Sequence, residues 1–232
     1  MFNNWEIFEG YKNFKLTEDI KEKLERYFEI LTEENAKYNL TRITEENDVY
    51  VKHFLDSLLF TENCPITNQK IADIGTGAGF PGIVLKIFFP ATEITLIESN
   101  NKKVFFLNLA IEKLGLTGIT VTNERAEEFS VAHKEEFDIV VSRAVAYLDI
   151  ILEIGVQLVK VGGLYITLKG PRADEEMRHL RGRDVKMGLS LTEKQILVDK
   201  GYGERINLFY TKTTSTNEMY PRTYSAIKKD SQ

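Results

Sequence analysis

The chain alternates short apolar runs with longer stretches in which apolar residues recur at helical spacing. The short runs are typical of buried strands, and the longer stretches are typical of helices with one apolar face. From about residue 70 onward this alternation predicts an α/β domain with a mostly parallel sheet, helices on both faces and right-handed crossovers. The runs that we expect to form strands are 70–74, 93–98, 118–122, 137–142, 164–168, 193–199 and 205–211.

The first part of the chain has a helical pattern instead. Residues 17–34 place their apolar side chains on one face, with Thr17 as the N-cap, and a second amphipathic helix opens at Thr44. A proline and several polar residues break this pattern before the first strand. We therefore predict an N-terminal helical extension over residues 1–65 and a core domain over residues 66–232.

The stretch from residue 70 to residue 82 carries the strongest chemical signal. It reads Lys-Ile-Ala-Asp-Ile-Gly-Thr-Gly-Ala-Gly-Phe-Pro-Gly, so an apolar run leads directly into Gly75, Gly77 and Gly79. A second apolar run of helical length follows. Glycines between a strand and a helix let the chain turn sharply and let its backbone approach a nucleotide-like cofactor. Taken alone, the glycines also fit an ordinary tight turn, but the flanking elements and an acid at Glu98 favour a cofactor site.

The residues around the glycines distinguish between two cofactors. A dinucleotide site requires a third glycine at the position of Phe80, so an NAD site is disfavoured. Asp73 precedes the first glycine, where it can meet a cationic amino group directly or through water. Glu98 ends the next apolar run, where its carboxylate can accept hydrogen bonds from ribose hydroxyls. This combination favours S-adenosylmethionine.

Composition limits the remaining possibilities. The chain has 232 residues, of which 43% are hydrophobic and 28% charged, as in an ordinary soluble globular protein. The single cysteine, Cys64, has no partner for an internal disulfide, and the histidines at 53, 133 and 179 lack metal-ligand spacing, so we expect no metal. The first residues do not read as a secretion signal, and no apolar run approaches the ~20 residues that cross a bilayer. We therefore expect a cytoplasmic protein without a membrane partner.

The charged residues give conflicting indications of whether the protein binds nucleic acid. The net charge of −5 disfavours a stand-alone nucleic-acid binder. Residues 169–186, however, contain six basic residues against four acidic ones. This segment and Arg222 are predicted to form a basic rim, although a mixed-charge helix exposed to water would have the same composition.

Every candidate polar cluster follows a predicted strand at its carboxyl end. These clusters are Gly75–Gly79, Glu98, Arg125–Glu127, Ser142–Arg143 and Lys169. Ligands of open α/β sheets bind at that edge of the sheet. Each cluster alone would fit a helix cap or a loop in water, but their coincidence predicts a single site.

Six short motifs are distributed over most of the chain. They are Asn39-Leu40-Thr41, His53-Phe54-Leu55-Asp56-Ser57-Leu58, the stretch Asp73–Gly82 with its Gly-Phe-Pro-Gly ending, Ser142-Arg143-Ala144, Lys169-Gly170 and Tyr220-Pro221-Arg222. On these residues the chain, from about residue 35 to residue 222, resembles the class I S-adenosylmethionine-dependent methyltransferases. Within them it resembles the bacterial 16S ribosomal RNA guanine-N7 methyltransferases, the RsmG or glucose-inhibited division protein B family.

The resemblance implies a doubly wound, Rossmann-like sheet of seven strands with an N-terminal helical cap. It also implies methyl transfer from S-adenosylmethionine to N7 of one guanine in 16S ribosomal RNA. The partner would be 16S rRNA or the small ribosomal subunit. We expect a monomer, separately from the resemblance. In the family a proline- and basic-rich run usually follows Tyr-Pro-Arg, whereas Thr223–Gln232 lacks proline, so the resemblance assigns no RNA role to these last residues.

The same resemblance implies roles for individual residues. By the family pattern, Gly75 and Phe80 line the methionine end of the cofactor, Glu98 holds the ribose, Ala126 and Glu127 lie beside the adenine, and Arg143 belongs to the cofactor or substrate pocket. With Asp73, Gly77 and Gly79 from the loop itself, these are the predicted cofactor-binding residues. His53, Lys169 and Arg222 are predicted to contact RNA.

Methyl transfer to a ring nitrogen requires no general base, because guanine N7 carries a lone pair and no proton. The predicted catalytic role therefore falls to Arg143, which would position the methionine carboxylate or the RNA. Methylases of exocyclic amines often carry an Asn/Asp-Pro-Pro-aromatic loop where this chain has Ser142-Arg143-Ala144-Val145. Three alternatives stay open: an NAD-dependent reductase, which Phe80 disfavours, a small-molecule or protein methyltransferase of the same fold, and a cofactor-binding module without catalysis.

Overall fold

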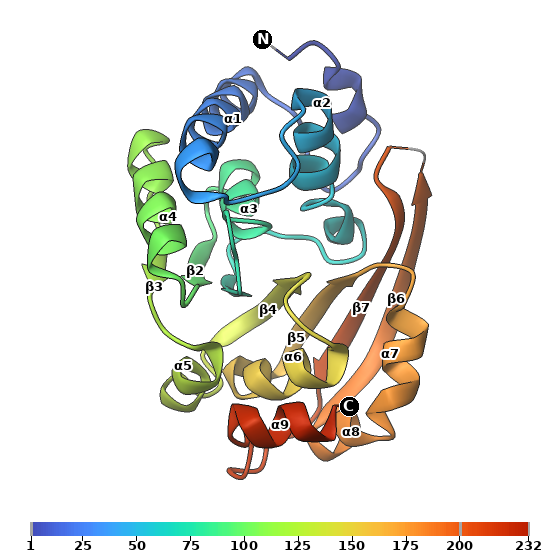
Figure 1. Cartoon of the computed structure of the whole chain (residues 1–232). Helices are drawn as coiled ribbons and strands as arrows, with labels where there is room; N and C mark the ends of the chain where they lie inside the picture. Colours follow the sequence, from blue (N-terminus) through green and yellow to red (C-terminus); the bar gives the residue numbers. More distant parts are fainter. Residues whose placement is uncertain (1, 200, 232) are drawn as a thin grey trace.

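Seven strands form one sheet within residues 2–199 and 201–231, which the computed structural model describes. The strands are β1 (Lys70–Ile74), β2 (Glu93–Ile97), β3 (Ile119–Thr122), β4 (Phe137–Arg143), β5 (Val159–Lys169), β6 (Leu189–Asp199) and β7 (Gly203–Lys212). They lie in the order β3-β2-β1-β4-β5-β7-β6. Strand β7 is antiparallel to both of its neighbours, and the other neighbouring pairs are parallel. The predicted doubly wound, mostly parallel sheet is thus confirmed (Figure 1).

The pleat of the strands divides the hydrophobic core into two layers. In β1, Ile71 points to one face, whereas Ala72 and Ile74 point to the other. The Ile71 face is covered by α1 (Glu18–Tyr38), α2 (Glu46–Val49), α3 (Gly82–Phe88) and α4 (Asn101–Lys113). The opposite face is covered by α5 (Ala126–Ala132), α6 (Leu148–Gly155), α7 (Ala173–Leu180) and α9 (Tyr224–Asp230), with α8 (Arg183–Lys186) after α7. Figure 1 shows the two groups of helices on either side of the sheet.

Helix α1 begins where the sequence predicts and ties the N-terminal part to the sheet. The Thr17 hydroxyl accepts a hydrogen bond from the Ile20 amide at 3.3 Å, which confirms Thr17 as the N-cap. Leu24 in α1 and Phe54, in the π-helical turn Tyr50–Leu55 that continues α2, are fully buried in the same cluster as strand β1. The helical extension therefore shares a core with the sheet. The domain boundary between residues 65 and 66 stays a prediction.

Strand β5 begins earlier than predicted, at Val159. Between the pairs that Val159 and Leu164 form with β4, the register shifts and β5 contains a bulge. Gly162, with φ of +85°, supplies the left-handed backbone at this bulge. The paired glycines Gly162 and Gly163 have the pattern of a turn, so the strand predicted from the sequence begins only after them, at residue 164.

Candidate active site

The strands β1, β2, β4 and β5 end at one edge of the sheet, where three hollows adjoin one another. The Glu98 hollow, of about 320 Å³, lies between the glycine loop after β1 and the start of α5. The Tyr147 hollow, of about 630 Å³, lies between the loop after β4 and the segment after β5. The Arg143 hollow, of about 300 Å³, lies on the side of His53. Ala144 lines all three hollows, so the loop after β4 is their shared wall.

The glycine loop packs too closely against its neighbours to carry side chains. Gly75 has φ of +65°, and a Cβ there would lie 2.6 Å from Cγ2 of Val145. Gly79 has φ of +93°, and its Cβ would lie 2.6 Å from the hydroxyl of Tyr27. Both positions therefore require glycine for its backbone conformation and for its lack of a side chain. At Gly77, with φ of +63°, an added Cβ would meet only the Gly75 carbonyl oxygen, at 3.9 Å, so the backbone conformation alone favours glycine there.

Glu98 lies at the end of β2, on the wall of the first hollow. Its two carboxylate oxygens accept hydrogen bonds from the Gly77 amide at 3.1 Å and from the Asn100 amide at 2.9 Å. The Lys103 ammonium lies 3.8 Å away. These contacts fix the carboxylate, which keeps further lone pairs for a ligand hydroxyl.

Asp73 is fully buried beneath the glycine loop and does not line the Glu98 hollow. Its Oδ2 accepts hydrogen bonds from the Thr76 hydroxyl at 2.6 Å and from the Gly82 amide at 2.9 Å. Its Oδ1 has no hydrogen-bond partner among the described residues. Burial raises the pKa of this carboxyl to about 6, against the hydrogen bonds from Thr76 and Gly82, which lower it. In this conformation Asp73 shapes the loop, and its predicted contact with a cofactor stays a prediction.

The two residues that the resemblance assigns to the adenine lie at the start of α5. Ala126 and Glu127 line the Glu98 hollow together with Tyr224 of α9. Glu127 pairs with Arg125 at 2.9 Å, and the Arg125 guanidinium lies 4.7 Å from the centroid of the Tyr224 ring. No pattern in the sequence indicates Tyr224, because a polar chain end has no periodic signal that would place it beside α5.

Arg143, at the end of β4, is held by groups from the N-terminal part of the chain. Its guanidinium donates to Asp56 at 3.1 Å, to the carbonyl of Lys52 at 3.3 Å and to Nδ1 of His53 at 3.1 Å. Arg205 of β7 donates to the second oxygen of Asp56 at 2.6 Å. Arg143 thus lines the hollow named after it and does not line the Glu98 hollow.

His53 and Phe80 stack beside this ion pair. Their ring centroids lie 4.5 Å apart, and the Arg143 guanidinium lies 5.1 Å from the Phe80 centroid. Because Nδ1 of His53 accepts from Arg143, its Nε2 carries the proton and donates to the Thr41 hydroxyl at 2.8 Å. Burial and the Arg143 charge lower the pKa of His53 to about 3, so the ring is neutral at physiological pH. Motifs far apart in the sequence therefore meet here.

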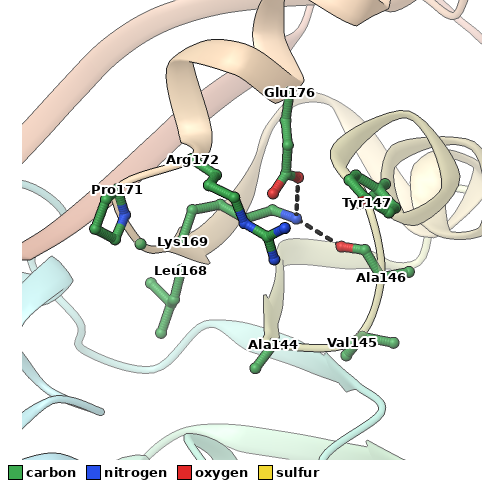
Figure 2. A pocket seen from close by; sticks show the side chains of 10 residues that line it. Ala144, Val145, Ala146, Tyr147, Leu168, Lys169, Pro171, Arg172 and Glu176 are labelled. Carbon is green, nitrogen blue, oxygen red and sulfur yellow. Dashed lines mark hydrogen bonds and ion pairs between the residues drawn. The ribbon is translucent and has the colours of Figure 1, made fainter.

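The cations predicted to contact RNA are already paired. Lys169 donates to the Ala146 carbonyl at 2.7 Å and to Glu176 at 2.8 Å on the wall of the Tyr147 hollow (Figure 2). Arg222 lines none of the three hollows and is held by Glu153 at 2.8 Å and by Asp230. Contact with phosphates would compete with these pairs, so the RNA roles of Lys169 and Arg222 stay predictions.

Neither a metal site nor a membrane-spanning helix is found in residues 2–199 and 201–231. No group of three or more His, Cys, Asp or Glu side chains in these ranges lies in an arrangement that could hold a metal ion. None of the helices formed there has the length and apolar character needed to cross a membrane.

The sheet order, the glycine loop after β1 and the acid at the end of β2 define a Rossmann-like methyltransferase fold. Solved structures have the same fold at low sequence identity. TrmN from Thermus thermophilus is 15% identical, with a TM-score of 0.55, over 68% of this chain and 48% of its own. A SAM-dependent methyltransferase from Aquifex aeolicus is 16% identical, with a TM-score of 0.52, over 70% of this chain and 92% of its own.

Sequence comparison identifies the family within this class. The family model described as rRNA small subunit methyltransferase G matches residues 20–220. The Ribosomal RNA small subunit methyltransferase G of Mycoplasma capricolum subsp. capricolum is 62% identical over 232 residues, which is 100% of both chains. This chain therefore belongs to the rRNA small subunit methyltransferase G family, and the resemblance inferred from its motifs is confirmed.

Replacing Asp73 by Asn should remove a pH-dependent loss of stability. The pKa of the buried carboxyl is raised from 3.8 to about 6, so between these values the folded state retains a proton that the unfolded chain loses. The protonated carboxyl thus contributes about 3 kcal/mol to the free energy of unfolding below about pH 4. This contribution is lost as the pH rises through about 6. The amide of D73N does not titrate. Urea unfolding of both proteins from pH 4 to pH 7 measures the difference.

Asp48→Asn, at a half-exposed position, is the matched control for the change from aspartate to asparagine itself. The account of Asp73 would be wrong if the difference in unfolding free energy between D73N and the wild type were constant over this pH range.

Proposed function

We propose that this protein transfers a methyl group from S-adenosylmethionine to N7 of a guanine in 16S ribosomal RNA. The observation that carries the proposal is the meeting of the family-specific motifs at one sheet edge. His53, Phe80 and Arg143 come from three of these motifs and contact one another beside the loop that separates the hollows. Membership of the family over the full chain supports the same substrate.

The Glu98 hollow fits S-adenosylmethionine. Gly75 lines this hollow with its backbone, and the fixed Glu98 carboxylate would accept hydrogen bonds from the ribose hydroxyls. Ala126 and Glu127 would lie beside the adenine. The bound cofactor would supply an activated methyl carbon.

The protein's part in the reaction is alignment. Guanine N7 offers a lone pair without losing a proton, so the residues need only hold the base in line with the methyl carbon at close range. The pKa of His53, about 3, makes its ring a weak base. This fits a reaction in which no group has to accept a proton. A reaction on rRNA would take place in the cytoplasm, and we infer that the enzyme acts as a monomer.

Arg143 would act on the RNA side of the site. Its guanidinium lines the Arg143 hollow, where it is fixed by Asp56 and His53. Because Arg143 does not line the Glu98 hollow, this geometry favours a role in positioning the RNA. It disfavours a contact with the methionine carboxylate of the cofactor. Exposed cations in the segment after β5, such as Arg172, would contact phosphates in a salt-dependent manner.

Glu98→Gln should weaken binding of S-adenosylhomocysteine about 10- to 100-fold, because the amide keeps the shape but replaces an acceptor oxygen with a donor group. Isothermal titration calorimetry measures the dissociation constant. Glu124 lines the same hollow and accepts a hydrogen bond from the Thr122 hydroxyl, so Glu124→Gln is the matched control and should change the constant less than about twofold. Equal effects of the two substitutions would refute the role of Glu98.

Incubation with methyl-labelled S-adenosylmethionine should place label on a single guanine N7 of 16S rRNA. The assay offers 16S rRNA, intact small subunits and small metabolites in parallel, and chain cleavage at N7-methylguanine maps the product. Because the pKa of His53 is about 3 and N7 loses no proton, the rate should vary less than about twofold from pH 6 to pH 8. Label on a metabolite, on protein or on an exocyclic amine would contradict the proposed function.

A further inference from the structure

The Tyr147 hollow is placed to hold the acceptor base. It shares Ala144, Val145 and Ala146 with the Glu98 hollow, so the two cavities meet across a single loop. A methyl donor in the Glu98 hollow and an acceptor in the Tyr147 hollow would therefore face each other at this loop. The Arg143 hollow shares only Ala144 with the Glu98 hollow and is less directly connected.

A carboxylate with one free oxygen lies on the wall of the Tyr147 hollow. Oε2 of Glu176, in the first part of α7, accepts hydrogen bonds from the Lys169 ammonium and from the Leu148 amide, both at 2.8 Å. Within the described residues no donor contacts its Oε1. Figure 2 shows the carboxylate pointing toward Lys169, with a single oxygen in the ion pair.

These contacts hold the carboxylate in place before any ligand binds. The side chains of Glu176 and Lys169 are only 11% and 9% exposed, and Lys169 also donates to the Ala146 carbonyl at 2.7 Å. The end of β5, the start of α7 and the loop after β4 are thus linked by one ammonium group. A fixed acceptor in a half-enclosed cavity discriminates between ligands better than a mobile one.

An aromatic ring and a guanidinium lie at the same hollow. Tyr147 is 51% exposed although it lines the cavity, and the Arg172 guanidinium lies 6.0 Å from the centroid of its ring. Exposed aromatic rings and arginine side chains are the groups on which proteins stack unpaired RNA bases. Figure 2 shows both side chains flanking the ion pair.

We propose that the Tyr147 hollow binds the target guanine, with Glu176 Oε1 accepting from its N1–H and 2-amino groups and Tyr147 stacking on its ring. Adenine offers neither donor, so Glu176 would be the residue that specifies guanine. These donors lie on a different edge of the base from N7, which keeps its lone pair free for the methyl carbon. The proposal rests on the proposed function and adds the site and the specificity residue.

The test combines a protein substitution with a base substitution. Inosine lacks the 2-amino group, so 16S rRNA with inosine ligated in at the mapped target position removes one proposed donor. For the wild type, kcat/KM should fall about tenfold on this change. For Glu176→Gln, which offers an amide in place of the carboxylate, the penalty should shrink to less than about twofold, with the affinity for S-adenosylhomocysteine unchanged.

Glu175→Gln provides the matched control, because Glu175 is exposed on the same helix and does not line the hollow. It should keep the tenfold penalty. An equal penalty for inosine in the wild type and in E176Q would overturn the role of Glu176 while leaving the proposed function intact. A wild type that labels no rRNA guanine would overturn both.

A second pair of variants tests the site even if E176Q does not fold. Tyr147 is half exposed, so Tyr147→Ala should leave folding unchanged and raise KM for the RNA about tenfold. Tyr147→Phe keeps the ring and should behave like the wild type. If Tyr147→Ala had the wild-type KM, the base would not stack on this ring and the Tyr147 hollow would not be its site.

Discussion

The close packing of the glycine loop is the constraint on which the rest of this edge depends. Gly75 leaves room for Val145 of the loop after β4, and Gly79 leaves room for Tyr27 of α1. The Tyr27 hydroxyl also donates to the carbonyl of Ala78 in the loop. Through these contacts the glycine loop joins the N-terminal helices to the sheet and to the loop after β4.

A buried ion pair extends this connection across the sheet edge. Asp56 binds both Arg143 of β4 and Arg205 of β7, so the N-terminal part is attached to two strands by charge as well as by apolar packing. Removing one member of such a buried group leaves the others uncompensated and costs about 3–5 kcal/mol. The N-terminal helices are thus part of the wall of the site, since they supply His53 and Asp56 to the Arg143 hollow.

The parts of the structure that depend on local patterns could be predicted from the sequence. Apolar runs located the parallel strands, and the glycine loop with Glu98 located one hollow, because each signal lies within a short segment. Contacts between distant segments had no such signal. Tyr224, Glu176 and Arg205 reach their positions through the order of the strands and helices, and no spacing in the sequence encodes that order.

The same limit explains why the pairing of the basic side chains could not be predicted. Composition gives the number of basic residues in the segment after β5. It does not show that Lys169 is buried against Glu176 or that Arg222 is held by Glu153. A count of charges treats these side chains as free, whereas burial requires each of them to find a partner. Two members of the predicted basic rim, Lys169 and Arg222, are thus paired with acids in this conformation, and the rim stays a prediction.

A crystal structure with S-adenosylhomocysteine would show whether the methyl donor and the guanine bind in two hollows that meet across the loop after β4. We expect the ribose hydroxyls on Glu98 and the sulfur beside Ala144–Ala146, facing the Tyr147 hollow. A ligand bound elsewhere, or with its sulfur turned away from that loop, would rule this arrangement out.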